Sequence, residues 1–195
     1  MILKLTALVR KKYPSLGKKK YCFKKYCITP IRRQDIQKIR KWRNEQIDVL
    51  RQTKTLTAEA QIRFYNKEIT RSFYSKEPDM ILFSFLLNNS CIGYGGLVHI
   101  NWPSKKAEVS ILTKTERNDD KEVYQKDFSA FFKLIKKLAF EELEFNSLVT
   151  ETYEIRTYVI KLLEEMKFVL KRRKEKHMKI KGTYVDSLIH ECLKD

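Results

Sequence analysis

Three apolar stretches follow one another between residues 80 and 114, and a turn signal separates each from the next. They read MILFSFLLNN (80–89), CIGYGGLVHINW (91–102) and KAEVSILTK (106–114). Asn88-Asn89 and Pro103-Ser104 lie between them, and these residue types are typical of tight turns. Apolar runs of this length between turns are typical of strands, so the segment predicts three antiparallel neighbours in one sheet.

Helical spacing marks the segments on both sides of these strands. Residues 35–44 repeat apolar residues at helical intervals after Asp35, and Thr57 is placed to cap a second helix that runs through Phe73. Asp119 or Asp120 opens a long helix to about residue 143. The apolar face predicted for this helix consists of Phe128, Phe131, Phe132, Ile135, Leu138, Ala139 and Glu142.

The remaining segments complete the order β-α-α-β-β-β-α-β-α-β-β. Residues 21–32 predict one strand closed by Pro30, 148–153 a strand, 156–166 a helix, and 168–193 a hairpin that turns at Lys181-Gly182. This order predicts an α/β (mixed α+β) fold, with helices on both faces of a central mixed, mostly antiparallel sheet. At 195 residues, we expect one domain over 21–195, preceded by a basic arm over 1–20.

The charge of the chain is strongly positive. It has 41 Lys and Arg against 24 Asp and Glu, a formal net charge of +17. This charge favours anionic partners such as nucleic acid, membrane surfaces or phosphorylated ligands, and it does not choose among them. The longest nearly apolar run, residues 80–87, is far too short to cross a bilayer, so we expect no membrane span.

The four cysteines have no paired spacing. Cys22, Cys27, Cys91 and Cys192 are scattered, whereas a structural zinc site needs four ligands brought together, usually from close pairs. The sequence therefore predicts no metal site. Reduced thiols of a cytoplasmic protein are the expectation for all four cysteines.

Three segments in this order resemble the GNAT acetyltransferase superfamily. They are ITPIRRQDIQKIRKWRN (28–44), CIGYGGLVHINWPSKKAEVSIL (91–112) and GTYVDSLIHECL (182–193), and the resemblance covers about residues 27–193. The closer likeness is to the branch that contains ribosomal-protein N-terminal acetyltransferases and bacterial amino-sugar acetyltransferases. The resemblance implies an acyltransferase that uses acetyl-CoA as its co-substrate.

In that family the strand equivalent to 107–113 parts from the strand equivalent to 148–153, and the pantetheine arm of coenzyme A lies in the opening. A strand that leaves its neighbour has unpaired N–H and C=O groups, which an amide-bearing ligand satisfies. An ordinary inner strand with no such role is the open alternative. The residues that the resemblance assigns to pantetheine are Val109, Ser110, Ile111 and Leu112.

The resemblance implies that the pyrophosphate binds at the start of the long helix, where free N–H groups and the helix dipole favour negative charge. The family's glycine-rich turn is missing there, because residues 115–123 read TERNDDKEV. Asp119 and Asp120 would repel phosphates, and Asp119 with Glu122 is placed to form a capping box on the same N–H groups. The predicted phosphate contacts are Arg117, Asn118 and Lys121.

Acetyl transfer to an amine needs a base that takes the ammonium proton. Glu108, on the strand that parts from its neighbour, is the first candidate for this base. Glu151, on the facing strand, is the alternative. A surface glutamate in a strand is the open alternative reading for Glu108.

The reaction also needs a donor that protonates the leaving thiolate. The family's usual Tyr position, on the helix after the facing strand, is occupied by Leu163, and its usual Asn position by Arg156. Tyr158 is therefore the expected donor, with Tyr153 as a second candidate close by. Packing stays open as the role of both tyrosines.

Acceptor-binding residues are expected at two places. The first helix ends in Trp42, Arg43 and Asn44, which in the family lead into the acceptor-binding loop. His99 ends a strand on the acceptor side, and Trp102 beside Pro103 is a candidate platform for a sugar or base. Core packing for the tryptophans and a structural role for the histidine stay open.

We expect a cytoplasmic N-acetyltransferase that moves an acetyl group from acetyl-CoA to a small anionic primary amine, with an amino sugar on a nucleotide carrier as the leading acceptor. Nα-acetylation of a protein is the alternative within this class. A monomer or a homodimer is expected.

A non-catalytic relative that binds RNA or an acidic partner is the alternative from another class. The run KRRKEKHMK (171–179) supports it, although a lysine-rich edge strand explains the same run. No RNA-binding motif accompanies the run, so nucleic acid is not favoured as a partner. On a regular strand, Lys174 and His177 would face opposite sides.

Overall fold

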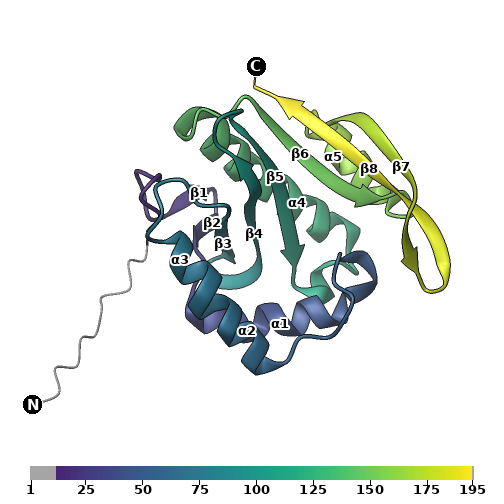
Figure 1. Ribbon diagram of the computed structural model, residues 1–195, viewed down its shortest axis with the longest axis horizontal. Helices are drawn as coiled ribbons and strands as arrows, with labels where there is room; N and C mark the ends of the chain where they lie inside the picture. Colours follow the sequence, from purple (N-terminus) through teal and green to yellow (C-terminus); the bar gives the residue numbers. More distant parts are fainter. Residues whose placement is uncertain (1–11, 195) are drawn as a thin grey trace, which may run out of the picture.

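The structure is a computed structural model that describes residues 12–194. A single sheet lies at its centre, with the strand order β1-β2-β3-β4-β5-β6-β8-β7 (Figure 1). β5 and β6 are parallel, and all other neighbouring strands are antiparallel. This confirms the predicted mixed, mostly antiparallel sheet. The strands are β1 (Tyr21–Phe23), β2 (Tyr26–Pro30), β3 (Ile81–Leu87), β4 (Ser90–Asn101), β5 (Lys106–Thr113), β6 (Ser147–Tyr153), β7 (Val169–Ile180) and β8 (Thr183–Leu193).

The helices occupy the segments that the sequence predicts. Thr57 caps α2, since its hydroxyl accepts a hydrogen bond from the Ala60 N–H at 3.1 Å. Wider π-helical turns at Tyr65–Ile69 and Leu138–Glu142 extend α2 and α4. The helices are α1 (Ile36–Glu45), α2 (Ala58–Phe64), α3 (Thr70–Ser72), α4 (Lys121–Lys137) and α5 (Thr157–Glu165).

The core forms where α4 packs on the sheet. The Phe131 ring of α4 meets the Phe85 ring of β3 edge-on, with centroids 5.3 Å apart. The apolar residues predicted for the face of this helix are all buried. Glu142 is the exception, because its carboxylate accepts hydrogen bonds from the Tyr21 hydroxyl and the Gly17 N–H.

The predicted meander of β3, β4 and β5 is confirmed, and it is covered on both faces. Residues 81–86 of β3 are buried without interruption, and successive side chains of a strand point to opposite faces. Gly95 allows the close packing of this region, because a Cβ there would lie 2.1 Å from the Ser110 carbonyl oxygen and 2.8 Å from the Phe131 ring.

The segment predicted as one strand over 21–32 is instead a short hairpin. β1 and β2 pair around a turn in which Lys24 has a positive φ of 52°. A disulfide joins Cys22 to Cys27, so the expectation of reduced thiols is wrong for this pair. Cys91 and Cys192 are free and buried. Lys24-Lys25 lacks the glycine, proline or asparagine that usually marks a turn, which is why the sequence pattern missed it.

Residues before the first strand contribute to the core. Tyr13 and Leu16 are buried, and the Tyr13 hydroxyl both donates to the Leu82 carbonyl and accepts from the Leu82 N–H at 2.8 Å. These two residues of the expected arm are therefore part of the folded core. Residues 1–11 of the expected arm lie outside the described residues, and the boundary of the domain stays a prediction.

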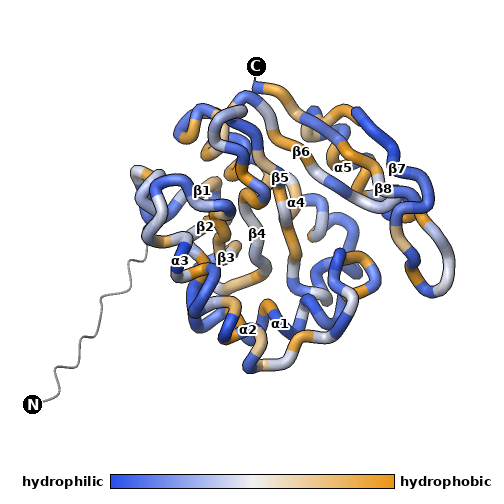
Figure 2. The backbone as a smooth tube through the Cα atoms, viewed as in Figure 1, coloured by the Kyte–Doolittle hydropathy of each residue, from blue (hydrophilic) through white to orange (hydrophobic). Residues whose placement is uncertain are grey.

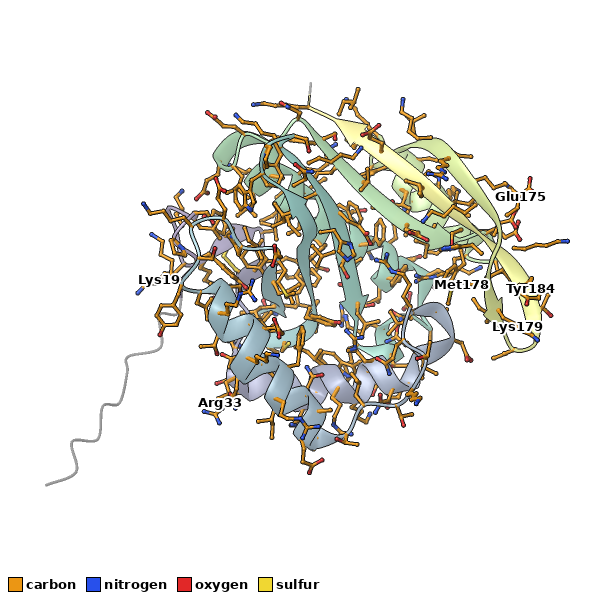
Figure 3. The ribbon with its side chains drawn as sticks, viewed as in Figure 1. Lys19, Arg33, Glu175, Met178, Lys179 and Tyr184 are labelled. Atoms are coloured by element: carbon orange, nitrogen blue, oxygen red, sulfur yellow. A yellow bond between two sulfur atoms is a disulfide. The ribbon has the colours of Figure 1, made fainter. Side chains whose placement is uncertain are left out.

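The hairpin of β7 and β8 forms one edge of the sheet, and its turn at Lys181-Gly182 is confirmed. Hydrophilic residues line most of β7 (Figure 2), as expected for an edge strand rich in lysine. Figure 3 shows Lys179 and Tyr184 at the far end of the hairpin, where the Lys179 ammonium lies 5.6 Å from the Tyr184 ring centroid. No helix within residues 12–194 is long and apolar enough to cross a membrane.

Candidate functional site

The two parallel strands at the centre of the sheet stay together for only three residues. Residues 106–108 of β5 pair with 147–149 of β6, and the pairing ends there. Beyond that point β5 remains paired with β4 up to Thr113, and β6 remains paired with β8 up to Tyr153. The strands therefore separate after Glu108 (Figure 1), as the sequence predicts.

A cavity of about 580 Å³ lies in this opening. Its size falls within the roughly 300–1,000 Å³ of ordinary ligand pockets. Three arginines from other elements also line it, namely Arg43 of α1, Arg51 of the following loop and Arg156 before α5. The strand residues in its wall include Glu108, Val109, Ser110, Ile111 and Leu112 of β5, and Thr150, Glu151, Thr152 and Tyr153 of β6.

The backbone of β5 offers hydrogen-bonding groups to the cavity. The Lys114 N–H donates to the Ile92 carbonyl just after β4 and β5 stop pairing. Backbone groups of successive strand residues point to opposite edges, so those of Val109 and Ile111 face the opening. No strand among residues 12–194 pairs with them on that side. An extended ligand with amide groups would satisfy them.

The β6 wall carries hydroxyls that lack partners. Thr150, Thr152 and Tyr153 are each at most 5% exposed, and none of their hydroxyls forms a hydrogen bond within residues 12–194. A buried polar group without a partner costs about 1–3 kcal/mol. A polar ligand or water in the cavity is therefore expected to bind these hydroxyls. Burial raises the pKa of the Tyr153 hydroxyl, so it keeps its proton.

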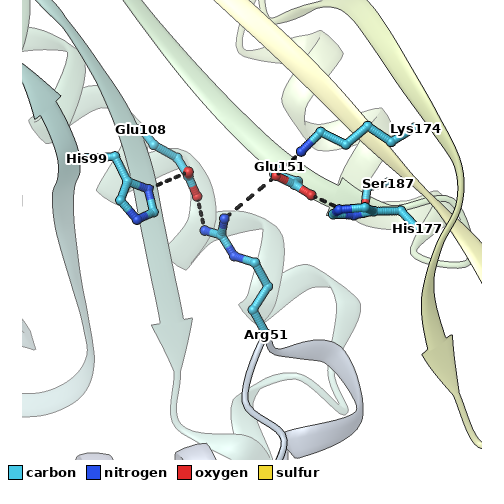
Figure 4. Close-up of polar contacts among 7 residues, drawn as sticks. All are labelled: Arg51, His99, Glu108, Glu151, Lys174, His177 and Ser187. Carbon is cyan, nitrogen blue, oxygen red and sulfur yellow. Dashed lines mark hydrogen bonds and ion pairs between the residues drawn. The ribbon is translucent and has the colours of Figure 1, made fainter.

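Two carboxylates face each other near the point of separation (Figure 4). Glu108 of β5 contacts His99, whose Nδ1 lies 2.9 Å from its Oε2. Arg51 donates from Nη2 to Glu108 Oε1, and its Nη1 lies 3.6 Å from Glu151 Oε2. One guanidinium thus bridges the carboxylates of the two separated strands.

Glu151 has further partners on the β7–β8 hairpin. The Lys174 ammonium donates to Oε2 at 3.2 Å, and His177 Nδ1 lies 3.3 Å from Oε1 and 2.8 Å from the Ser187 hydroxyl (Figure 4). Burial raises the pKa of the Glu151 carboxyl, but the hydrogen bonds of Lys174 and Ser187 and the charges of Lys174 and Arg51 outweigh burial and lower it below its ordinary value. Glu151 is therefore ionised at neutral pH.

Lys174 and His177 reach the same carboxylate because β7 is irregular. Its pairing with β8 shifts between Lys174 and Met178. The expectation that these two side chains face opposite sides is therefore wrong, since a bulge changes the alternation of a strand.

The start of α4 is closed by its own side chains. Asp120 is the N-cap residue, and its Oδ1 accepts hydrogen bonds from the Glu122 and Val123 N–H groups at 2.9 and 3.0 Å. The expected capping box of Asp119 with Glu122 is therefore wrong, because the N-cap residue is Asp120 and not Asp119. Arg117 forms a two-pronged ion pair with Asp127, whose side chain is fully buried.

A sequence model of the protein family described as acetyltransferase (GNAT) domain matches residues 28–189 of this chain. The chain belongs to the GNAT acetyltransferase family. It is an acetyl-CoA-dependent N-acetyltransferase, and acetyl-CoA is its co-substrate. No curated protein matches the chain in sequence.

Solved structures with this GNAT fold include spermidine N-acetyltransferase from Vibrio cholerae in complex with CoA and spermine. It has a TM-score of 0.72 and 17% identity, over 88% of this chain and 97% of that chain. A dodecameric structure of spermidine N-acetyltransferase from Vibrio cholerae in an intermediate state has a TM-score of 0.66 and 17% identity, over 88% and 95%. At these identities the likeness concerns the fold alone.

The opening of this GNAT domain fits the pantetheine arm, because it combines the free edge of β5 with unpaired hydroxyls on β6. The start of α4, where the resemblance implies that the pyrophosphate binds, does not offer free groups in the same way. Asp120 already occupies N–H groups that a pyrophosphate needs, and Arg117 is held by Asp127. Arg156 lines the cavity and forms no ion pair with a carboxylate within residues 12–194.

The other residues predicted for cofactor and catalysis lie around the start of α4. The Asn118 side chain contacts Thr113 and donates to Gln46 Oε1 at 2.9 Å. Lys121 lies over the Tyr158 ring, 5.8 Å from its centroid. The Tyr158 hydroxyl donates to the Lys121 carbonyl at 3.0 Å, and Tyr158 does not line the cavity.

The predicted acceptor residues divide into two groups. Arg43 and His99 line the cavity, and Arg43 donates to the Tyr94 hydroxyl at 2.6 Å. Trp42 is buried in the core, and Trp102 donates to the Pro78 carbonyl at 3.0 Å, so neither tryptophan lines the cavity. Asn44 binds the N–H and the carbonyl of Leu56 and so holds the loop after α1.

Sequence patterns gave no sign of Arg51, Lys174 or His177 as site residues. Arg51 lies in an irregular loop, and the other two are part of a basic run that looks like an exposed edge. They reach Glu108 and Glu151 only through the tertiary fold (Figure 4). Residues 12–194 contain no cluster of three or more His, Cys, Asp or Glu that could hold a metal ion.

The cap at α4 leads to a prediction for coenzyme A binding. Asp120→Asn keeps an oxygen that accepts the two N–H bonds and removes the negative charge beside the phosphate site. We expect the Kd for coenzyme A, measured by calorimetry, to fall about twofold to fivefold with little change in the unfolding midpoint. This decrease corresponds to the typical contribution of about 0.3–1 kcal/mol from a charge at a helix terminus.

Asp119→Asn is the matched control, because it removes the same charge without touching the capping bonds. A smaller change is expected for it. A weaker affinity in Asp120→Asn would show that the carboxylate helps the site rather than opposing the phosphates.

Proposed function

We propose that this N-acetyltransferase acts on a small primary amine and that Glu108 is its catalytic base. The proposal rests on the position of Glu108. This residue is the last of β5 that pairs with β6, so its carboxylate lines the cavity at the point where the two strands separate. His99, in contact with Glu108 and with a side chain that is 68% exposed, connects this carboxylate to solvent.

Acetyl-CoA supplies the acetyl group as a reactive thioester. Glu108 takes the proton that the acceptor ammonium must lose before the amine attacks. The N–H groups of Val109 and Ile111 hold amide groups along β5, and Arg156 with Lys121 would hold phosphates in place of Arg117. The Tyr153 hydroxyl, protonated and without a partner in the cavity wall, supplies the proton for the departing sulfur.

The leading acceptor is an amine that also carries an anionic group, such as an amino sugar on a nucleotide carrier. Arg43 and Arg51, which line the cavity and have no proposed role toward the cofactor, support this class. This acceptor agrees with the amino-sugar branch that the sequence resembles.

A polyamine is the second candidate. Glu108 and Glu151 offer two negative charges to a cation at the opening. The neighbours of this fold named as spermidine N-acetyltransferases act on such a cation. At 17% identity these neighbours show only that the fold is shared. The observation in this chain that favours a polyamine is the pair of carboxylates of Glu108 and Glu151.

The location and the assembly of the enzyme stay predictions. A cytoplasmic location rests on the need for acetyl-CoA. The Cys22–Cys27 disulfide argues against it, because structural disulfides persist mainly in oxidising compartments. A monomer or a homodimer remains the expectation.

A panel of acceptors tests the proposed function. The enzyme is incubated with acetyl-CoA and, separately, a nucleotide-linked amino sugar, spermidine and an unacetylated peptide, and products are identified by mass spectrometry. We expect acetylation of the amino sugar to be fastest. Faster acetylation of spermidine would select the second candidate, and acetylation of the peptide alone would select protein Nα-acetylation.

The assignment of the base predicts a specific kinetic loss. Glu108→Gln should lower kcat/KM about 100-fold, the lower range for loss of a general base, while the Kd for coenzyme A stays within about twofold. Glu151→Gln is the matched comparison. A larger loss in Glu151→Gln would transfer the role of base to that residue.

Two Tyr→Phe variants, each of which removes one hydroxyl group, test the identity of the proton donor. Tyr153→Phe should lower kcat about tenfold or more without weakening coenzyme A binding, because it removes the one unpaired phenol in the cavity wall of the described chain. Tyr158→Phe should leave kcat nearly unchanged. Stopped-flow measurement of thiol release gives both rates, and the reverse order would restore Tyr158 as the donor.

A further inference from the structure

The guanidinium of Arg51 lies between two carboxylates that belong to different strands. Glu108 and Glu151 are 12% and 10% exposed, whereas Arg51 is 45% exposed (Figure 4). Two buried like charges at the same opening repel each other, and a cation between them removes that repulsion. Arg51 supplies this cation from outside the sheet.

The loop that carries Arg51 is held in place by other contacts. Asp48 lies 3.1 Å from the Lys181 ammonium at the tip of the β7–β8 hairpin. Gln52 accepts from Arg43 at 3.0 Å and donates to Asn44 at 3.1 Å. Loss of the Arg51 contacts therefore leaves the loop anchored at the mouth of the cavity.

The acceptor must bring a positive charge to the same place. A primary amine is an ammonium at neutral pH, and this ammonium has to approach Glu108 to give up its proton. The carboxylates that attract it already have cationic partners, because Arg51 pairs with Glu108 and, together with Lys174, with Glu151. The ammonium and the guanidinium therefore compete for one position, and the exchange of one positive charge for another leaves the charge of the site unchanged.

We propose that Arg51 selects the acceptor: the acceptor ammonium replaces its guanidinium between Glu108 and Glu151, and the displaced guanidinium then binds an anionic group of the same acceptor. This proposal rests on the proposed function, because it assumes that the amine reaches Glu108.

The proposal distinguishes the two acceptor classes. The displaced guanidinium stays near the cavity mouth because its loop is anchored on both sides. There it attracts a phosphate or carboxylate and repels a second ammonium. An amine with an anionic group is therefore favoured, and a polyamine is disfavoured, even though the two carboxylates alone would attract the polyamine.

Binding of two small probes tests this role without any need for turnover. Phosphoethanolamine carries one ammonium and one phosphate, and 1,4-diaminobutane carries two ammonium groups over a similar length. Their Kd values are measured by NMR titration, without acetyl-CoA, for the wild-type enzyme, Arg51→Gln and Arg51→Lys. Arg63→Gln, an exposed charge removed elsewhere, is the matched control.

The wild type should bind phosphoethanolamine about fivefold more tightly than the diamine, since one charge pair near a protein surface contributes on this order. Arg51→Gln should weaken phosphoethanolamine and strengthen the diamine, so that the preference disappears or reverses. Arg51→Lys keeps the charge without the planar fork, and it should keep part of the preference. Arg63→Gln should keep all of it.

Three results would overturn the proposal: a wild type that prefers the diamine, an Arg51→Gln variant that changes both affinities by the same factor, or a wild type that binds neither probe. The acceptor panel with acetyl-CoA is a separate measurement. Acetylation of the amino sugar or of spermidine in that panel would keep the proposed function intact even if Arg51 proved to have only a structural role.

Discussion

The site depends on the early end of one strand pairing. β5 and β6 are joined over three residues and then separate, while each remains bound to its other neighbour. The sheet can open in its middle because β4 and β8 keep the separated strands in place. This opening creates the free edge of β5, the hydroxyl-bearing wall of β6 and the cavity between them. It also brings Glu108 and Glu151 to opposite sides of a single space.

Opposite charges in this enzyme are paired both at the opening and beside the start of α4. At the proposed acceptor end, Arg51 and Lys174 pair with Glu108 and Glu151, and beside the start of α4 Arg117 pairs with Asp127. The formal net charge of +17 therefore describes the surface better than the site. The basic run on β7 illustrates this, because most of it is exposed while Lys174 belongs to the acceptor end.

The sequence predicted the architecture well because most of its elements are specified locally. The aromatic face of α4, the cap at Thr57 and the turn at Lys181-Gly182 were all confirmed. The β1–β2 hairpin and its disulfide were missed because no turn residue marks them. Among the site predictions, the strand residues 109–112 line the cavity, whereas Trp42 lies in the core, since an aromatic side chain at helical spacing has the same pattern in both roles.

Periodicity and turn chemistry act over a few residues, so the sequence by itself determined the order of elements. The resemblance of three segments to a family then indicated which two strands form the opening. The family likeness also placed Glu108 and Glu151 on those strands. Only the tertiary structure decided what surrounds them. Arg51 is 57 residues from Glu108, and Lys174 and His177 are 23 and 26 residues from Glu151, and no local pattern encodes contacts over such separations. The loop after α1 and the bulged edge strand bring these side chains to the carboxylates, because packing brings those two elements together at the opening.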